Sequence, residues 1–298
     1  MAKARAIGKR RKAVQNIRKI TRTMQLIATA RFQSAYSRAM ATKPYVENIT
    51  RLVEELSRAG GDIQHPLLTV NQGTGRTILI VLTSNRGLCG GYNSAMLRTA
   101  MEHIRGQEAA GRSVELNVVG KKGIAYFKFL NRPMVWTDTG FEGTPAFAQV
   151  DKIAGALMDA YTGRRVDAVH VAYTRFLSAG AQRPEVLQLL PIRRPGAAEA
   201  AAERSPLLAG ETGVQYEFSP PAEQLLAELL PEFVKVRLFQ CFNDAAVSEQ
   251  TARMVAMKAA TDAAGDMIRS LTQRLNRARQ SQITLELLDI VAGAEALA

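Results

Sequence analysis

The C-terminal part of the chain lacks helix-breaking residues over an unusually long distance. From Glu232 to Ala292 there is no proline and only one glycine, Gly265. A continuous helix over this stretch would be roughly 90 Å long at about 1.5 Å per residue. A globular core requires nothing of that length, so the stretch predicts a helix that extends beyond a compact domain.

Apolar and small residues in this stretch repeat at alternating steps of three and four. This 3.5-residue period is typical of a left-handed coiled coil, in which a second helix covers the repeated positions. Two ordinary amphipathic helices on one globular core are the alternative, but the length of the pattern favours the coiled coil. The repeated positions are Met254, Met257, Thr261, Ala264, Ile268, Leu271, Leu275 and Ala278.

The N-terminal part supplies a candidate for the second helix. Lys9 to Thr42 contains neither glycine nor proline and carries apolar residues at helical spacing, namely Val14, Ile17, Ile20, Met24 and Ile27. We expect Pro44 to kink this helix and Gly60-Gly61 to end it. The sequence thus predicts a long antiparallel coiled coil of the terminal helices, with a compact domain inserted between them.

The positive charge of the chain is concentrated on the first helix. Of the 39 basic residues, twelve precede the first acidic residue, Glu47, which leaves 27 to balance the 27 acidic ones. Cations near a helix N-terminus are unfavourable unless an anion lies nearby. A solvated basic face is one interpretation; an acidic protein surface, nucleic acid or a membrane surface are the others.

Short β-rich runs alternate with helical ones in the middle of the chain, which predicts a Rossmann-like α/β domain. We expect the last two strands, Ala168–Phe176 and Glu185–Leu190, to pair with each other. The other expected strands are Thr77–Thr83, Val114–Val119 and Met134–Trp136, and the expected helices are Ser94–Arg105, Lys121–Leu130 and Phe147–Tyr161.

These patterns divide the chain into four segments. The expected fold as a whole combines features of the α+β and α/β classes. Residues 1–60 form the N-terminal coiled-coil helix, 76–192 the α/β domain, 193–213 a connector rich in alanine, proline and glycine, and 220–298 the C-terminal coiled-coil helix. We also expect a short strand at Gln215–Phe218 and a kink or restart of the last helix at Pro231.

The glycine-rich turn after the first strand resembles a phosphate site only superficially. Gly87, Gly90 and Gly91 have the spacing G-x-x-G-G rather than G-x-G-x-x-G, and no Gly-Lys-Ser/Thr follows the strand. We interpret these glycines as permitting a tight turn and close packing of helix on sheet. Cys89 in the turn has no histidine near it in sequence, so a buried thiol is favoured over a nucleophile.

No catalytic or metal-binding pattern is present elsewhere. Cys89 and Cys241 form no CxxC pair, and the three histidines show no HExxH spacing. No apolar run reaches the roughly 18 residues needed to cross a bilayer, and the basic N-terminus lacks the apolar stretch of a signal peptide. We therefore expect a soluble, non-exported, non-catalytic protein without cofactors.

Three motifs, in order, resemble the gamma subunit of F-type ATP synthases over nearly the whole chain. The first is Ile20 to Ala30, and the second is Ser84 to Asn93. The third is the most specific and comprises Ser248-Glu249-Gln250, Arg253 to Asp262, Asn276 to Gln280 and Ile283 to Glu286. Asn85 and Leu285 depart from the residues usual in that family.

The resemblance implies a rotor shaft that performs no bond chemistry. It would couple proton-driven rotation of a membrane c-ring to changes in the catalytic beta subunits, with the alpha and beta hexamer, epsilon and the c-ring as partners and no nucleic acid. It also implies a peripheral position at the cytoplasmic face of a bacterial membrane. The implied beta-subunit contacts are Arg10, Arg11, Arg22, Met24, Arg253, Arg279, Gln280, Thr284 and Glu286, and the implied c-ring contacts are Tyr216 and Glu217.

Two other functions stay open on the residues alone. The basic first helix is compatible with a nucleic-acid-binding coiled coil, although the C-terminal helix carries acidic residues and the basic run lacks interleaved aromatic ones. A dinucleotide-dependent enzyme would require the glycine turn to bind a cofactor. Salt-dependent DNA binding and cofactor binding by variants of Gly87 or Gly90 discriminate these two functions.

Overall fold

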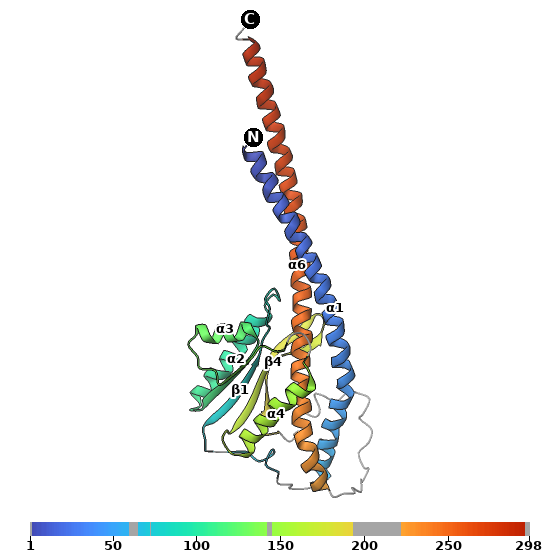
Figure 1. Ribbon diagram of the computed structural model, residues 1–298, viewed down its shortest axis with the longest axis vertical. Helices are drawn as coiled ribbons and strands as arrows, with labels where there is room; N and C mark the ends of the chain where they lie inside the picture. The colour runs from blue at the N-terminus through green and yellow to red at the C-terminus, as the bar shows by residue number, and fades with distance from the viewer. Residues whose placement is uncertain (1, 60–64, 72, 142–144, 193–221, 296–298) are drawn as a thin grey trace. The chain divides into compact units, whose positions relative to one another are not determined.

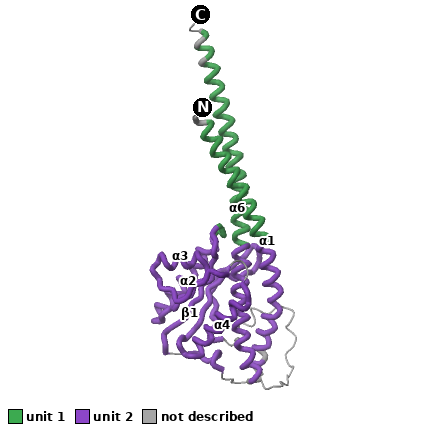
Figure 2. Tube along the Cα trace, in the orientation of Figure 1, with its two compact units in different colours: residues 1–30, 88–90, 251–298 green, residues 31–87, 91–250 purple. Residues whose placement is uncertain are grey.

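The structure, a computed structural model, describes residues 2–59, 65–71, 73–141, 145–192 and 222–295. The expected connector at 193–213 and the expected strand at Gln215–Phe218, which contains the implied c-ring contacts Tyr216 and Glu217, lie outside these ranges. The chain divides into two compact units (Figure 2). Unit 1 comprises Met1–Ala30, Leu88–Gly90 and Thr251–Ala298, and unit 2 comprises Arg31–Gly87 and Gly91–Gln250.

Two long helices each contribute to both units. Helix α1 spans Ala2–Ala59 and helix α6 spans Ala222–Glu295 (Figure 1). The prediction of long terminal helices is confirmed, and α1 ends directly before Gly60-Gly61 as expected. Of the kink or restart expected at Pro231, the restart is wrong, because α6 continues through that residue. Leu226, Leu230 and Val234 are fully buried on both sides of it, and this packing holds the helix despite the missing N–H.

Unit 2 contains a five-stranded sheet with the order β3-β2-β1-β4-β5. Neighbouring strands are parallel except for β4 and β5, which pair antiparallel; the prediction that these two strands pair with each other is confirmed. Strand β3 begins two residues later than expected, since it is Trp136 to Asp138 that lie in register with Asn117 to Val119 of β2. The strands are β1 Arg76–Leu82, β2 Ser113–Val119, β3 Trp136–Asp138, β4 Ala168–Ser178 and β5 Ala181–Leu190.

Helices cover both faces of this sheet. Helices α2 (Tyr92–Ala109) and α3 (Lys121–Phe129) pack on the face that carries Leu79 and Val81 of β1. Helix α4 (Phe147–Thr162) packs on the opposite face, with Ile78 and Ile80. The unit 2 parts of α1 and α6 join α4 there in one apolar core. Both faces of β1 are buried, because its neighbours to either side and its helices exclude water.

No helix within the described residues is both long and apolar enough to cross a lipid bilayer.

Candidate functional site

In unit 1, the two long helices pack against each other in opposite directions. The hydroxyl groups of Thr21 and Thr261 lie 2.8 Å apart. Val14, seven residues before Thr21, packs with Ala264 and Leu271, which follow Thr261. Ascending order in α1 is therefore matched by descending order in α6, so the predicted antiparallel arrangement holds for these segments (Figure 1).

The positions of α6 that the 3.5-residue period singled out are the covered ones. Met257, Thr261, Ala264 and Leu271 are buried, and the other four positions of the repeat are half-buried. Between them the side chains are mostly exposed. A narrow strip of α6 therefore faces α1, and Thr261 and Ala264 on it are small enough for the helices to approach closely.

The apolar face expected on α1 is mostly wrong. Ile17, Ile20 and Ile27 are 52%, 60% and 50% exposed, whereas Val14 and Ala28 are buried. A side chain three residues further along a helix lies about 60° short of a full turn. Ile20 and Ile27 therefore lie on a different side of α1 from Val14. The covered strip instead follows steps of seven through Val14, Thr21 and Ala28, while the isoleucines form an unpartnered apolar surface.

The end of α6 extends past the start of α1. Continuing the register from Thr21 beside Thr261 places Ala2, the first residue of α1, opposite Gln280. Residues 281–295 of α6 therefore have no α1 residue beside them (Figure 1). Sequence reasoning did not identify the exposed apolar side chains of this segment, although the 3.5-residue repeat stops at Ala278. They are Ile283, Leu285, Leu287, Leu288, Ile290 and Val291.

Basic side chains of α1 surround the exposed isoleucines. Lys9, Arg10, Lys12 and Arg22 are exposed, and none of them is paired with an acidic group in the part of the chain that the structure describes. The Nε atom of the neighbouring Arg11 is buried and has no hydrogen-bond partner among the described residues. This end of α1 thus presents a concentrated positive charge that no acidic group of the described residues neutralises.

The other residues implied as partner contacts fall into two groups. Arg279, Gln280, Thr284 and Glu286 are exposed near the end of α6, and Met24 of α1 is half-buried. In contrast, Arg253 is only 7% exposed and takes part in interactions inside the chain. Arg253 therefore has little exposed surface with which to contact a partner.

Polar side chains in the segment around the glycine-rich turn form hydrogen bonds with residues both near and far in sequence. Asn93 Oδ1 accepts a hydrogen bond from the backbone N–H of Ser84 at 3.0 Å. Asn85 donates to the carbonyl oxygen of Thr139 at 2.9 Å and accepts from the N–H of Lys121 at 3.1 Å. Asn85 thus bonds to residues far from it in sequence rather than within its own turn, and Cys89 is buried as interpreted.

Close packing of helix on sheet requires glycine at Gly120 and not at Gly87 or Gly91 of the turn. A Cβ atom on Gly87 would only touch the end of the Lys122 side chain, and one on Gly91 would meet only the Ser94 hydroxyl. On Gly120, by contrast, it would lie 2.1 Å from the carbonyl oxygen of Thr83, and its φ of +98° favours glycine. The tight approach of α3 to the sheet therefore depends on Gly120.

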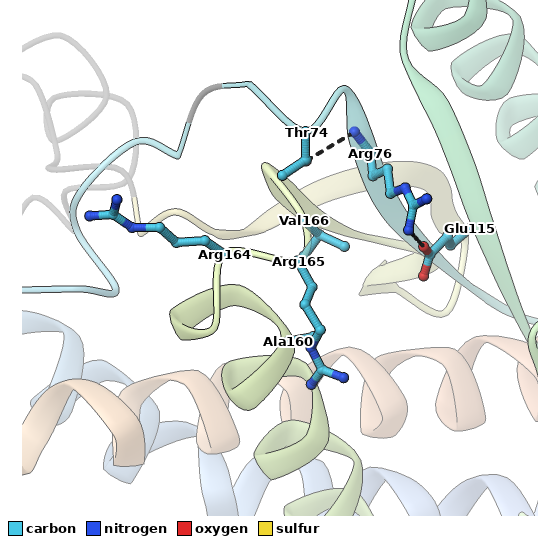
Figure 3. A pocket seen from close by; sticks show the side chains of 7 residues that line it. All are labelled: Thr74, Arg76, Glu115, Ala160, Arg164, Arg165 and Val166. Carbon is cyan, nitrogen blue, oxygen red and sulfur yellow. Dashed lines mark hydrogen bonds and ion pairs between the residues drawn. The ribbon is translucent and has the colours of Figure 1, made fainter.

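A surface depression of about 510 Å³ lies at the start of β1 and the end of α4 in unit 2. Arg76 is paired there with Glu115 at 3.9 Å. Figure 3 shows the guanidinium groups of Arg76, Arg164 and Arg165 pointing in different directions rather than towards one point. Because the cations do not converge, this arrangement does not form a binding site for a single anion.

Comparison with known proteins connects this fold to a family. The family model described as ATP synthase matches residues 3–297. The rotor of the Euglena gracilis mitochondrial ATP synthase in rotational state 1 is a structural neighbour with a TM-score of 0.62 and 17% identity, covering 95% of this chain and 99% of that one. The fold and the match together define the class: the chain belongs to the ATP synthase family.

Relatives identify the kind of chain within that family. The ATP synthase gamma chain of Rhodopirellula baltica is 47% identical over 298 residues, which cover 100% of this chain and 99% of that protein. The ATP synthase gamma chain of Nocardia farcinica is 40% identical over 319 residues, with 100% and 98% covered. The chain's place in the family is therefore among the gamma chains.

Proposed function

We propose that this chain is the central rotor shaft of an F-type ATP synthase. It couples proton-driven rotation of a membrane c-ring to conformational changes in the catalytic beta subunits, which make ATP from ADP and phosphate. The chain itself performs no bond chemistry. The antiparallel packing of α1 and α6 in unit 1 is the observation that carries this function, because a shaft must transmit torque.

The helix pair of unit 1 acts as a coiled coil. The covered strip on α6 keeps the 3.5-residue period from Met254 to Ala278, and side chains interlocked at that period resist relative rotation of the helices. Two helices in contact resist twist better than one. Unit 2 is a Rossmann-like domain that belongs to the foot of the rotor.

The exposed part of unit 1 lies inside the ring of alpha and beta subunits. The apolar side chains of residues 283–291 are covered by apolar surface of that ring, since exposed apolar area of this kind typically marks an interaction site. An acidic loop of the beta subunit faces the basic end of α1, which carries Arg10, Arg11, Arg22 and Met24. This acidic partner supplies the anionic charge that the described residues lack there.

Polar residues near the end of α6 set the angular position of the shaft. Arg279 presents a planar guanidinium that can bind a carboxylate through two hydrogen bonds, with Gln280, Thr284 and Glu286 beside it in sequence. Because Arg253 is buried, it stabilises the fold of this chain in addition to any contact that it makes with the beta subunit.

Membrane contacts are assigned to the foot of the rotor. Tyr216 and Glu217 contact the c-ring, and epsilon binds the same foot. The complex lies at the cytoplasmic face of a bacterial membrane, with this chain as a peripheral component.

Copurification and coupling test this function. The chain should copurify with the alpha and beta subunits, and a chain lacking residues 259–298 should lose proton-driven ATP synthesis. A milder variant, with Leu285, Leu288 and Ile290 changed to Ser, keeps the α1 contacts and should reduce synthesis about tenfold or more, as loss of buried apolar area predicts. Lys128→Gln, on the exposed side of α3, is the matched control.

Two results would contradict the rotor. One is a chain that is never found with alpha and beta subunits, and the other is full coupled synthesis by the chain lacking residues 259–298. Salt-dependent binding of DNA by the chain, in place of copurification, would favour the nucleic-acid function instead.

A further inference from the structure

Two histidine side chains are in contact between α2 and the sheet in unit 2. His103 belongs to α2 and His170 to β4, and their ring centroids are 4.6 Å apart at an interplanar angle of 56°. His170 is buried and lies on the same face of β4 as Ala172, two residues further on, which is part of the apolar core under α2. The histidine pair therefore joins the helix to the strand that it covers.

The positions around the pair carry neutral side chains. Leu79 of β1 and Gln188 of β5 lie in register with His170 on its two sides. The residues of α2 one turn before and one turn after His103 are Thr99, Ala100, Gly106 and Gln107. At all of these positions, the titratable group that faces His103 is His170 itself.

Charged residues of α2 close to His103 in sequence point elsewhere. Glu102 and Arg105 are both exposed, and successive side chains of a helix are separated by about 100° around its axis. No carboxylate at the positions named therefore lies where it could stabilise a positive charge on His103.

The His103 side chain has no acceptor for an additional proton. Its Nε2 atom is buried and has no hydrogen-bond partner among the described residues. A neutral imidazole has one donor and one acceptor nitrogen, whereas a protonated imidazole has two donors. Protonation would leave a buried N–H unpaired and place a charge beside a second imidazole, and both are unfavourable. In agreement with this geometry, burial lowers the pKa of the His103 imidazole.

The other end of α2 is held by different groups. The Tyr92 hydroxyl donates a hydrogen bond to the carbonyl oxygen of Ala245 of α6 at 3.2 Å. The Ser94 hydroxyl donates to the carbonyl oxygen of Gly91 at 3.0 Å. These contacts at the start of α2 involve no imidazole, so the histidine pair acts on the second half of the helix.

We propose that the contact between His103 and His170 is an acid-sensitive joint, which loosens the second half of α2 from β4 when His103 takes up a proton. In the neutral state the two rings pack against each other. After protonation, the charge and the unpaired N–H of His103 are satisfied when the side chain turns out into water. The joint depends on the fold of unit 2 and not on the proposed function.

The direction of the pH effect follows from linkage. An imidazole whose pKa is lowered in the folded state contributes stability that is fully present above its ordinary pKa of about 6.5 and is lost as pH falls through the folded value. The second half of α2 should therefore be held more tightly at pH 7.5 than at pH 5.

Hydrogen exchange of the full-length chain tests the joint. Protection factors of the amides of residues 100–107, corrected for the intrinsic pH dependence of exchange, should fall by about threefold or more from pH 7.5 to pH 5. Amides of residues 95–98, near the end that Tyr92 holds, should keep their protection. An equal fall in both segments would mean that the whole helix opens, and would overturn the joint.

Two variants separate this pair from other acid effects. His103→Phe keeps an aromatic ring against His170 but cannot take up a proton, so the protection of residues 100–107 should no longer fall at pH 5. His65→Gln is the control. It removes a histidine whose Nδ1 accepts a hydrogen bond from the N–H of Leu67, away from α2, and should retain the wild-type fall. The same fall in His103→Phe as in the wild type would contradict the proposal.

A measurement on the wild-type chain covers the case in which His103→Phe does not fold. The chain has three histidines, whose ring proton signals can be followed individually by NMR. The His103 signal should titrate below pH 6.5 and in step with the loss of protection in residues 100–107. A His103 ring that titrates at or above pH 6.5, or without any change in that protection, would overturn the joint.

Discussion

Helix α6 lies in two different environments along its length. In unit 2 the consecutive residues Cys241, Phe242 and Asn243 are all buried, which means that the helix is covered on several sides because each residue advances about 100° around the axis. In unit 1 burial is confined to one strip, with Thr261, Ala264 and Leu271 as members. Beyond Gln280 the apolar side chains are exposed.

This difference teaches where the stability of the chain resides. A side chain covered on all sides loses both transfer free energy and packing when it is truncated. A buried strip residue such as Leu271 packs in a cluster of only a few side chains and therefore loses fewer contacts when it is truncated. Unit 2 should therefore carry most of the stability of the isolated chain, and unit 1, whose helix α6 is covered along one strip only, should contribute less to it.

The largest effect should come from adding a methyl group where unit 2 has no room. Gly120→Ala places Cβ against the Thr83 carbonyl and strains a positive φ, so it should lower the free energy of unfolding by about 3–5 kcal/mol. The matched change in unit 1 is Gly265→Ala. Its Cβ would meet Arg18 only at 3.9 Å, and better helix propensity should stabilise that segment by about 0.5–1 kcal/mol.

Urea unfolding of the two glycine variants measures this contrast. Similar destabilisation by both would mean that the helix pair of unit 1 is as densely packed as the sheet domain.

Truncation of leucines on α6 should give the next largest effect. Leu238→Ala, at a fully buried position of unit 2, should cost about 3–4 kcal/mol, and Leu271→Ala, on the strip of unit 1, about 1–2 kcal/mol. Leu287→Ala, 59% exposed on the same helix, is the control and should change stability by less than about 0.5 kcal/mol. Equal losses for Leu238 and Leu271 would contradict the division into a dense and a narrow region.

Sequence patterns predicted the elements well where local rules and packing agree. The absence of glycine and proline and the 3.5-residue period predicted α6 and the residues that its strip covers. The strands β1, β2 and β4 were found because apolar runs of their length favour buried strands. The pairing of β4 with β5 was also expected, and the structure shows that it is antiparallel.

The predictions failed where contacts between residues far apart in sequence determine the structure. Ile17, Ile20 and Ile27 looked like a core face because they are apolar, but small residues such as Ala28 let α6 approach on another side of α1. The apolar segment 283–291 was not recognised because its pattern gives no information on where α1 begins. Gly120 was missed because its crowding comes from Thr83, which is far from it in sequence and directly follows β1.

A smaller effect should follow loss of the hydroxyl contact in unit 1. Thr261→Val leaves Thr21 without its partner and should destabilise the helix pair by about 1 kcal/mol. The double variant Thr21→Val with Thr261→Val should recover most of this loss, because two apolar groups of the same shape replace the polar pair. Hydrogen exchange of α1 amides between residues 10 and 28 reports the change.

Thr284→Val is the control for that measurement. Its hydroxyl bonds only to Gln280 of its own helix, so exchange in α1 should not change. A double variant that is less stable than either single one would show that the hydroxyl pair is not the relevant contact.

The smallest effect on the isolated chain should come from its basic end. Replacing Arg10, Arg11 and Arg22 together by Gln should change the free energy of unfolding by less than about 0.5 kcal/mol, because Arg10 and Arg22 are exposed charges, which contribute little to stability, and the buried Nε atom of Arg11 has no hydrogen bond to lose among the described residues. In the assembled complex the same variant should weaken the coupling of rotation to ATP synthesis. The defect should be larger at low salt, since ions screen exposed charges over about 8 Å at physiological ionic strength. Coupled synthesis measured at low and high salt, with Lys128→Gln as control, decides the matter: equal defects at both salts would mean that the arginines act through packing within unit 1 rather than through an acidic partner.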